Sequence, residues 1–131
     1  MPMAKILIAD DSRFQVQLVS SCLTPRGFSV VSAGDALQTW MMALREKPEA
    51  IVLDINMPGG TGIEVLKRLR MSSKTQHIPV VVVSGSSEPN IERTVKELGA
   101  HHYLPKPVDP NDLGDLLLRL LEPPVSPKTD S

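Results

Sequence analysis

The stretch Leu53–Gly62 reads LDINMPGGTG and joins an apolar run to a segment without periodicity. The residues from Ala50 to Leu53 are all apolar, and the run then ends on Asp54. A short, continuous apolar run is typical of a strand covered on both faces, as in a parallel sheet. The glycines that follow indicate a loop. A carboxylate at the end of a buried strand makes Asp54 a candidate functional residue.

Four more runs of strand length lie elsewhere in the chain. They are Lys5–Ala9, Phe28–Ser32, Val80–Ser84 and His102–Leu104. Between and after these runs, apolar residues recur at helical spacing in five sets: Phe14, Leu18 and Cys22 with Val19 and Leu23; Ala36, Trp40, Ala43 and Leu44; Ile63, Leu66 and Leu69; Ile91, Val95 and Leu98; and Leu113, Leu116, Leu117, Leu120 and Leu121. Five strands that alternate with five helices predict a doubly wound α/β sandwich around a parallel sheet.

The length of the chain suits one domain, because 131 residues can bury a core without disulfides. We expect the domain to span residues 1–122 and the Pro-rich segment 123–131 to be a disordered tail or a linker stump. A net charge of −1 and four aromatic residues give no reason to expect direct binding to nucleic acid or to an anionic membrane. A single cysteine, no long apolar run and no signal-peptide pattern indicate a cytoplasmic protein.

Polar side chains stand at the ends of the predicted strands. Asp10 and Asp11 follow the first strand, Asp54 ends the third, Ser84 ends the fourth and Lys106 comes just after the fifth. Sites in doubly wound folds lie at the carboxyl ends of the strands, so we expect these groups to form one pocket.

The three carboxylates would repel one another unless a cation lay between them. Hard oxygen ligands, without His or Cys at ligand spacing, predict Mg²⁺, with Mn²⁺ as a substitute. Such an ion together with Lys106 balances the charge of the acids, so the pocket can admit a phosphoryl group. A nucleophilic oxygen, a metal and a lysine are the groups that phosphoryl transfer requires.

These pieces resemble the receiver domain of two-component response regulators over about residues 3–122. The matching residues are Asp10 and Asp11 after KILIA, the LDINMPGGTG stretch, Ser84 after VVVV, and YLPKP from Tyr103 to Pro107. The resemblance implies a flavodoxin-like three-layer sandwich with strand order 2-1-3-4-5.

The resemblance also implies roles for the acids. Asp54 would accept a phosphoryl group from a histidine kinase phosphohistidine or from a histidine phosphotransfer protein. Asp11 would bind Mg²⁺ directly, Asp10 would lie nearby or bind it through water, and Asp54 and the backbone carbonyl of Asn56 would complete the protein ligands.

For the phosphoryl group, the resemblance implies contacts with Lys106, Ser84, Asn56 and the small residue Gly85. Ser84 and Tyr103 would form a conformational switch, and the Lys106–Pro107 peptide bond is often cis in the family. The surface formed by the fourth helix, fifth strand and fifth helix would bind a downstream protein partner. The chain would be a monomer or a phosphorylation-dependent dimer.

Simpler interpretations remain open for single residues. Asp54 could cap the turn that follows its strand, and Asp11 with Ser12 could simply begin the first helix. Ser84 could be an ordinary turn serine and Tyr103 a static aromatic of an edge strand.

Two other functions are alternatives to a stand-alone switch. The chain could be the receiver part of a longer regulator with a DNA-binding or enzymatic output domain. It could also be a Mg²⁺-dependent phosphohydrolase with Asp54 as nucleophile, but such enzymes place a second aspartate two residues downstream as general acid and base. That position is Asn56, so we predict no enzyme beyond slow self-dephosphorylation, tuned by Asn56 and Ser86.

Overall fold

The computed structural model describes residues 4–57, 62–85 and 88–121. The predicted tail at 123–131, most of the glycine-rich loop and Ser86 therefore lie outside the described residues. The elements are β1 (Ala4–Ala9), α1 (Arg13–Leu23), the 3-10 turn η1 (Thr24–Arg26), β2 (Phe28–Ala33), α2 (Ala36–Glu46), β3 (Ala50–Asp54), α3 (Gly62–Met71), β4 (Val80–Ser84), α4 (Ile91–Glu97), β5 (His102–Pro105) and α5 (Pro110–Leu121).

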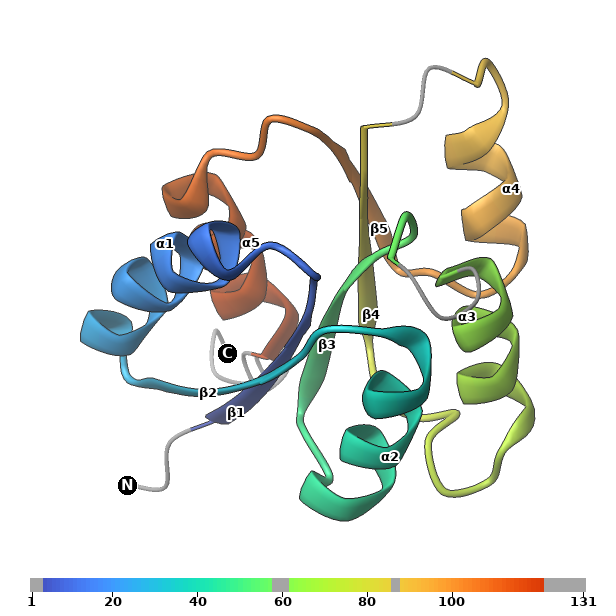
Figure 1. Ribbon diagram of the computed structural model, residues 1–131, viewed down its shortest axis with the longest axis horizontal. Coiled ribbons are helices and arrows are strands. Elements are labelled where there is room, and N and C mark those ends of the chain that lie inside the picture. The colour runs from blue at the N-terminus through green and yellow to red at the C-terminus, as the bar shows by residue number, and fades with distance from the viewer. Residues whose placement is uncertain (1–3, 58–61, 86–87, 122–131) are drawn as a thin grey trace, which may run out of the picture.

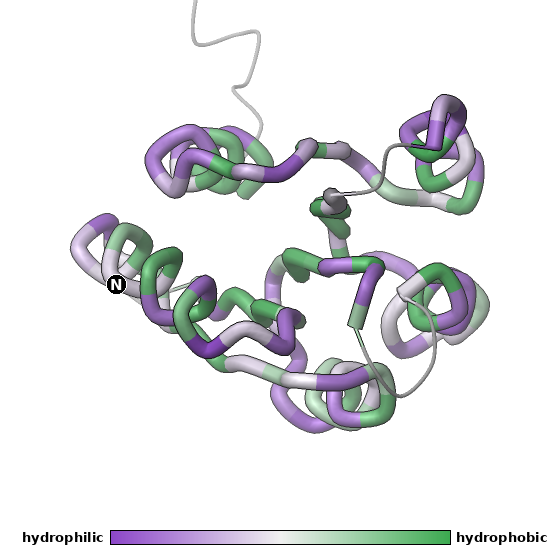
Figure 2. Tube along the Cα trace, turned by 45° about the horizontal axis from the view of Figure 1, so that its top comes forward, coloured by the Kyte–Doolittle hydropathy of each residue, from purple (hydrophilic) through white to green (hydrophobic). Residues whose placement is uncertain are grey.

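All five strands are parallel and lie in the order β2-β1-β3-β4-β5, which confirms the predicted doubly wound sheet. Helices α1 and α5 cover one face, and α2, α3 and α4 cover the other (Figure 1). Figure 2 shows the mostly hydrophobic strands enclosed between helices of mixed hydropathy. Within the described ranges, no helix has the length and apolar character that crossing a membrane requires.

The sheet buries both of its faces, as the continuous apolar runs predict. Along β1, Ile6 and Ile8 pack with residues of α1 and α5, whereas Leu7 and Ala9 pack with residues of α2, α3 and α4. Successive side chains of a strand point to opposite faces, so one apolar strand serves two cores. The polar end of each strand therefore lies beyond both cores, at the edge of the sheet.

The sequence prediction of which residues form the buried face of α1 is partly wrong. Phe14 is 71% exposed and Leu18 is 37% exposed, whereas Val19 and Leu23 are buried. Two stripes with four-residue spacing, 14-18-22 and 15-19-23, run side by side along this helix. Packing against the sheet decides between them, and the periodicity of the helix alone does not.

Hydrogen-bonding side chains fix where the first two helices begin. The Ser12 hydroxyl accepts a hydrogen bond from the backbone N–H of Gln15 at 3.2 Å, which makes Ser12 the N-cap of α1. Asp35 caps α2 in the same way through the N–H of Gln38 at 2.8 Å. The cap at Ser12 places the start of α1 directly after Asp11.

We predict that Gly62→Ala strongly destabilises the fold. The N–H of Gly62 donates to the carbonyl of Ile55 at 3.0 Å, and a Cβ at position 62 would lie 2.3 Å from the Cα of Ile55. Because the obstacle is backbone, a side-chain rotation cannot relieve it. We expect the free energy of unfolding to fall by about 3 kcal/mol, measured by urea denaturation.

Gly34→Ala is the matched control, because a Cβ there would meet only the Gln38 side chain at 3.8 Å. Its unfolding free energy should stay within about 0.5 kcal/mol of wild type. Equal urea midpoints for the two variants would contradict the prediction, because they would show that α3 can shift away from Ile55 with little loss of unfolding free energy.

Candidate functional site

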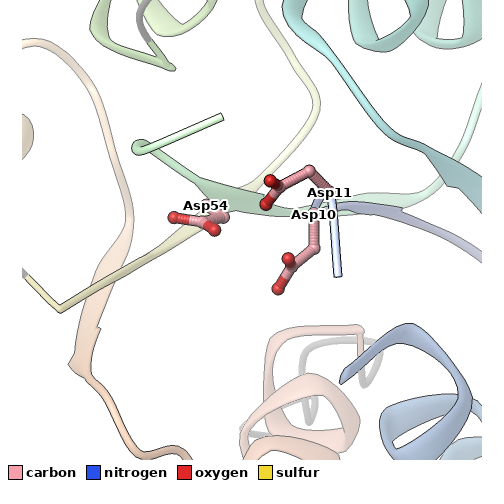
Figure 3. Close-up of side chains that lie close together, drawn as sticks. All are labelled: Asp10, Asp11 and Asp54. Carbon is pink, nitrogen blue, oxygen red and sulfur yellow. The ribbon is translucent and has the colours of Figure 1, made fainter. Parts of the chain in front are cut away.

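The carboxyl ends of β1 and β3 bring three carboxylates together. Asp10 and Asp11 follow β1, Asp54 ends β3, and the two strands are paired neighbours. One carboxylate oxygen from each of the three residues lies within 4.8 Å of the others. In Figure 3 the Asp11 carboxylate turns toward Asp54, whereas that of Asp10 points toward the side of α1 and α5. The predicted acidic cluster is therefore present.

Lys106 reaches this cluster from the other side. It follows β5, and its backbone N–H donates to the carbonyl of Ser84 at 2.9 Å. Its Nζ lies 2.9 Å from Oδ2 of Asp54 and 3.9 Å from Oδ2 of Asp10. The Lys106–Pro107 peptide bond is cis, as the resemblance implies. Residues from three strand ends thus meet at one point.

Asp54 is almost completely buried, with 3% of its surface exposed. Its Oδ1 accepts a hydrogen bond from the backbone N–H of Asn56 at 2.9 Å, and its Oδ2 accepts one from Lys106. Both oxygens therefore have partners, which offsets the cost of removing the carboxyl group from water. The N–H of Asn56 is the turn contact that the simpler interpretation of Asp54 expects. That interpretation does not account for the ammonium of Lys106.

Burial and neighbouring charges perturb the titration of two groups in the cluster. Burial raises the pKa of Asp10, and the charges of Asp54 and Asp11 raise it further, although the Ser12 N–H and Lys106 act in the opposite direction. Burial lowers the pKa of Lys106, but its hydrogen bond with Asp54 and the charges of all three acids outweigh that effect, so the pKa is raised. Both shifts favour the protonated form of the group concerned.

The donor set fits a hard divalent cation. The cluster contains carboxylates alone, without His or Cys. Oxygen ligands of this kind suit Mg²⁺ and Mn²⁺ and not Zn²⁺. The side chain of Asn56 is exposed, and its Nδ2 makes a long, 3.5 Å hydrogen bond to Oγ of Ser84.

The other predicted residues take different places. Ser84 ends β4, beside β3, and is 1% exposed. Gly85 is exposed, and a Cβ there would be in ordinary contact with Lys106 at 3.9 Å, so Lys106 does not itself require a glycine. Tyr103 is half-buried and packs against the core formed with α2, α3 and α4. It lies on β5 but makes none of the described hydrogen bonds of Asp54 or Lys106.

One residue of the site's surroundings was not predicted from the sequence. Gln15 lines a small cavity beneath the acidic cluster, together with Asp10, Asp54 and Lys106. Its signal is its spacing, because Gln15 precedes the buried Val19 and Leu23 at four-residue intervals. It is the polar member of the stripe that faces the sheet.

Fold and site together define a doubly wound α/β protein with an acidic, lysine-bridged pocket at the carboxyl edge of its sheet. The family model described as the response regulator receiver domain matches residues 6–118. The chain therefore belongs to the response regulator receiver family, whose members are signalling modules.

The chain matches relatives of very different lengths. Protein PilH of Pseudomonas aeruginosa is 34% identical over 111 residues, which cover 85% of this chain and 92% of PilH. Protein RcaC of Microchaete diplosiphon is 33% identical over 118 residues, which cover 90% of this chain but only 18% of RcaC. Among solved structures, the chemotaxis response regulator CheY4 of Vibrio cholerae has a TM-score of 0.83 and 34% identity, with 91% of this chain and 99% of CheY4 covered.

Proposed function

We propose that the chain is a phosphoacceptor switch of a two-component system, with Asp54 as the acceptor. The observation that carries this proposal is the Asp54 carboxylate itself, buried, flanked by two acids and held 2.9 Å from the ammonium of Lys106. A capping aspartate needs neither neighbouring acids nor a lysine. The donor is a sensor histidine kinase or a histidine phosphotransfer protein.

In the proposed reaction, an oxygen of Asp54 attacks the phosphorus of the donor's phosphohistidine. An O–P bond forms, the P–N bond breaks, and the electron pair remains on the imidazole nitrogen, which takes up a proton. Lys106 then pairs with an oxygen of the transferred group, and Ser84 donates a hydrogen bond to another. Stabilising charge at these oxygens is the main protein contribution to phosphoryl transfer.

The carboxylates of Asp10, Asp11 and Asp54, with the backbone carbonyl of Asn56, are the residues proposed to hold Mg²⁺. When bound, the ion neutralises negative charge on the carboxylates and on the transferring oxygens. The three carboxylates lie close together and repel one another, which supports a need for this second cation.

The output step of the proposal uses Ser84 and Tyr103. After phosphorylation, the Ser84 hydroxyl moves toward the new group and the Tyr103 ring turns inward. The surface formed by α4, β5 and α5 then binds the downstream partner or a second copy of the chain. Ser84 is already buried beside Asp54, and Tyr103 lies on the same strand that leads to Lys106.

Self-dephosphorylation resets the switch slowly, with Asn56 helping to position water. No turnover of free phosphate esters is proposed, because Asn56 stands where an aspartate-nucleophile phosphatase needs its general acid and base. The role implies the cytoplasm as compartment.

The same acceptor chemistry applies whether the receiver acts alone or within a longer regulator. The chain spans nearly all of PilH but 18% of RcaC and 23% of the response regulator PleD of Caulobacter vibrioides. A DNA-binding or enzymatic output domain is the second candidate architecture, and the full-length reading frame distinguishes the two.

The proposal can be tested by incubating the protein with acetyl phosphate as donor and measuring phosphorylation by intact mass. We expect one phosphoryl group per chain in the presence of Mg²⁺ and labelling at least about tenfold slower in excess chelator. Mn²⁺ should restore labelling. Equal rates with and without the metal, or steady release of phosphate from a generic ester at many turnovers per minute, would contradict it.

A further inference from the structure

A small cavity lies directly beneath the acidic cluster, on the side of the sheet that α1 and α5 cover. Its volume is about 30 Å³. Its lining is mostly apolar and comes from β1, β3 and β4, from α1 and α5, and from the segment after β5: Ile8, Ala9, Val19, Val52, Val83, Val108 and Leu113. A cavity of this size has room for one or two water molecules, provided that polar groups hold them.

Four polar residues complete the lining, and they are Asp10, Asp54, Lys106 and Gln15. The first three belong to the acidic site. Gln15 comes from α1 and belongs to the stripe that continues into the buried Val19 and Leu23. None of the hydrogen bonds among the described residues uses its side-chain amide, so the amide is available to a water molecule.

Lys106 and Asp10 also have hydrogen-bonding capacity to spare. The ammonium has three N–H groups, and among the described residues it donates only to Asp54, because Oδ2 of Asp10 at 3.9 Å is too far for a hydrogen bond. Asp10 accepts from the N–H of Ser12 through Oδ1, which leaves Oδ2 available. A water in the cavity would thus have a donor, an acceptor and the amide of Gln15 around it, within the two to four partners that buried waters need.

We propose that Gln15 is a positioning residue that holds ordered water in this cavity and, through that water, the ammonium of Lys106. The inference rests on the proposed function of Asp54. In the unphosphorylated state Lys106 is bound to Asp54, and that contact changes when Asp54 gains a phosphoryl group. The water held by Gln15 and Asp10 keeps the ammonium beside the transferring oxygens during this change. The amide therefore influences the rates of both phosphoryl gain and phosphoryl loss.

Gln15→Met tests the role, because Met has a similar length and lacks the amide. We expect phosphorylation by acetyl phosphate and subsequent dephosphorylation each to slow about threefold to tenfold, the effect of one lost hydrogen bond. We also expect loss of the water-to-methyl nuclear Overhauser effects that long-lived cavity water gives at Val83 and Val108 in the wild type. Urea denaturation should show no loss of stability, since an apolar side chain suits the rest of the lining.

Gln76→Met is the matched control, since it makes the same change at an exposed position before β4, at the opposite end of the sheet from the acidic cluster. Its rates should stay within twofold of wild type and its water signals unchanged. Gln15→Leu is a second apolar variant in case the Met variant folds poorly.

Wild-type rates in a folded Gln15→Met protein, or cavity water that survives the substitution, would overturn the inference. A wild-type chain that accepts no phosphoryl group would overturn the proposed function instead. The water signals of wild type and variant would then still decide whether Gln15 orders the cavity.

Discussion

Replacing Asp54 with Asn should abolish formation of the acyl phosphate and leave the fold intact. The amide keeps the size of the carboxyl group, and its oxygen can still accept the hydrogen bond from the N–H of Asn56. It lacks the anionic oxygen that attacks phosphorus, so labelling by acetyl phosphate should fall below detection by intact mass. Circular dichroism and urea denaturation should show a folded protein.

Asp112→Asn, the same chemical change at an exposed position in the first turn of α5, is the control and should be labelled at the wild-type rate. Peptide mapping identifies the labelled residue. An Asp54→Asn protein that still carries the label elsewhere in the site, for example at Asp10 or Asp11, would show that another carboxylate is the acceptor.

Replacing Lys106 with Ala should give the second large effect, because it removes the only described cation of the cluster. Without the ammonium 2.9 Å from Asp54, charge on the transferring oxygens loses one stabilising partner. Loss of such a partner typically slows catalysis by about a hundredfold or more, so we expect labelling by acetyl phosphate to slow to that extent. Prolonged incubation should still produce some labelled protein.

That labelled Lys106→Ala protein should not switch. Without the contact between Lys106 and the new phosphoryl group, amide shifts in α4, β5 and α5 should stay near their unphosphorylated values. In the unlabelled variant, Mg²⁺ should bind more tightly, by isothermal titration calorimetry, because no ammonium competes for the three carboxylates.

Lys67→Ala serves as the control, because within the described part of the chain that lysine pairs with Glu64 on the exposed side of α3 and not with the acidic cluster. It should change neither labelling nor Mg²⁺ affinity. If phosphorylated Lys106→Ala instead showed the amide shifts of the phosphorylated wild type, the proposed role of the lysine in the switch would be wrong.

The sequence predicted much of the site because its residues stand at strand ends. In a parallel sheet every carboxyl end lies at one edge, so Asp10, Asp11, Asp54 and Lys106 had to come near one another once the strands were recognised. The strand bounds were predicted to within one residue. An apolar run ends where the helices no longer cover the two faces of its strand, so the run marks the strand. The metal, the switch and the acceptor role stay predictions.

The face of α1 could not be predicted in the same way. The stripes that contain Phe14 and Gln15 differ by one residue, and both continue into apolar positions. A helix of 11 residues is turned by what it packs against, and here the sheet and α5 bury Val19 and Leu23 and leave Phe14 exposed. A phenylalanine in water and a glutamine toward the core contradict hydropathy, so the sequence pattern wrongly placed Phe14 and Leu18 on the buried face, although it correctly placed Val19 and Leu23 there.

By itself, the sequence determined which elements form and which chemical groups stand at their ends, because periodicity, turn residues and strand polarity are local properties. Only the tertiary structure decided the distances that matter, such as the 2.9 Å between Lys106 and Asp54 and the small cavity that Gln15 lines. Those distances depend on how long-range packing rotates α1 and places the segment after β5. Such packing is a property of all the elements together, and no single stretch of the chain encodes it.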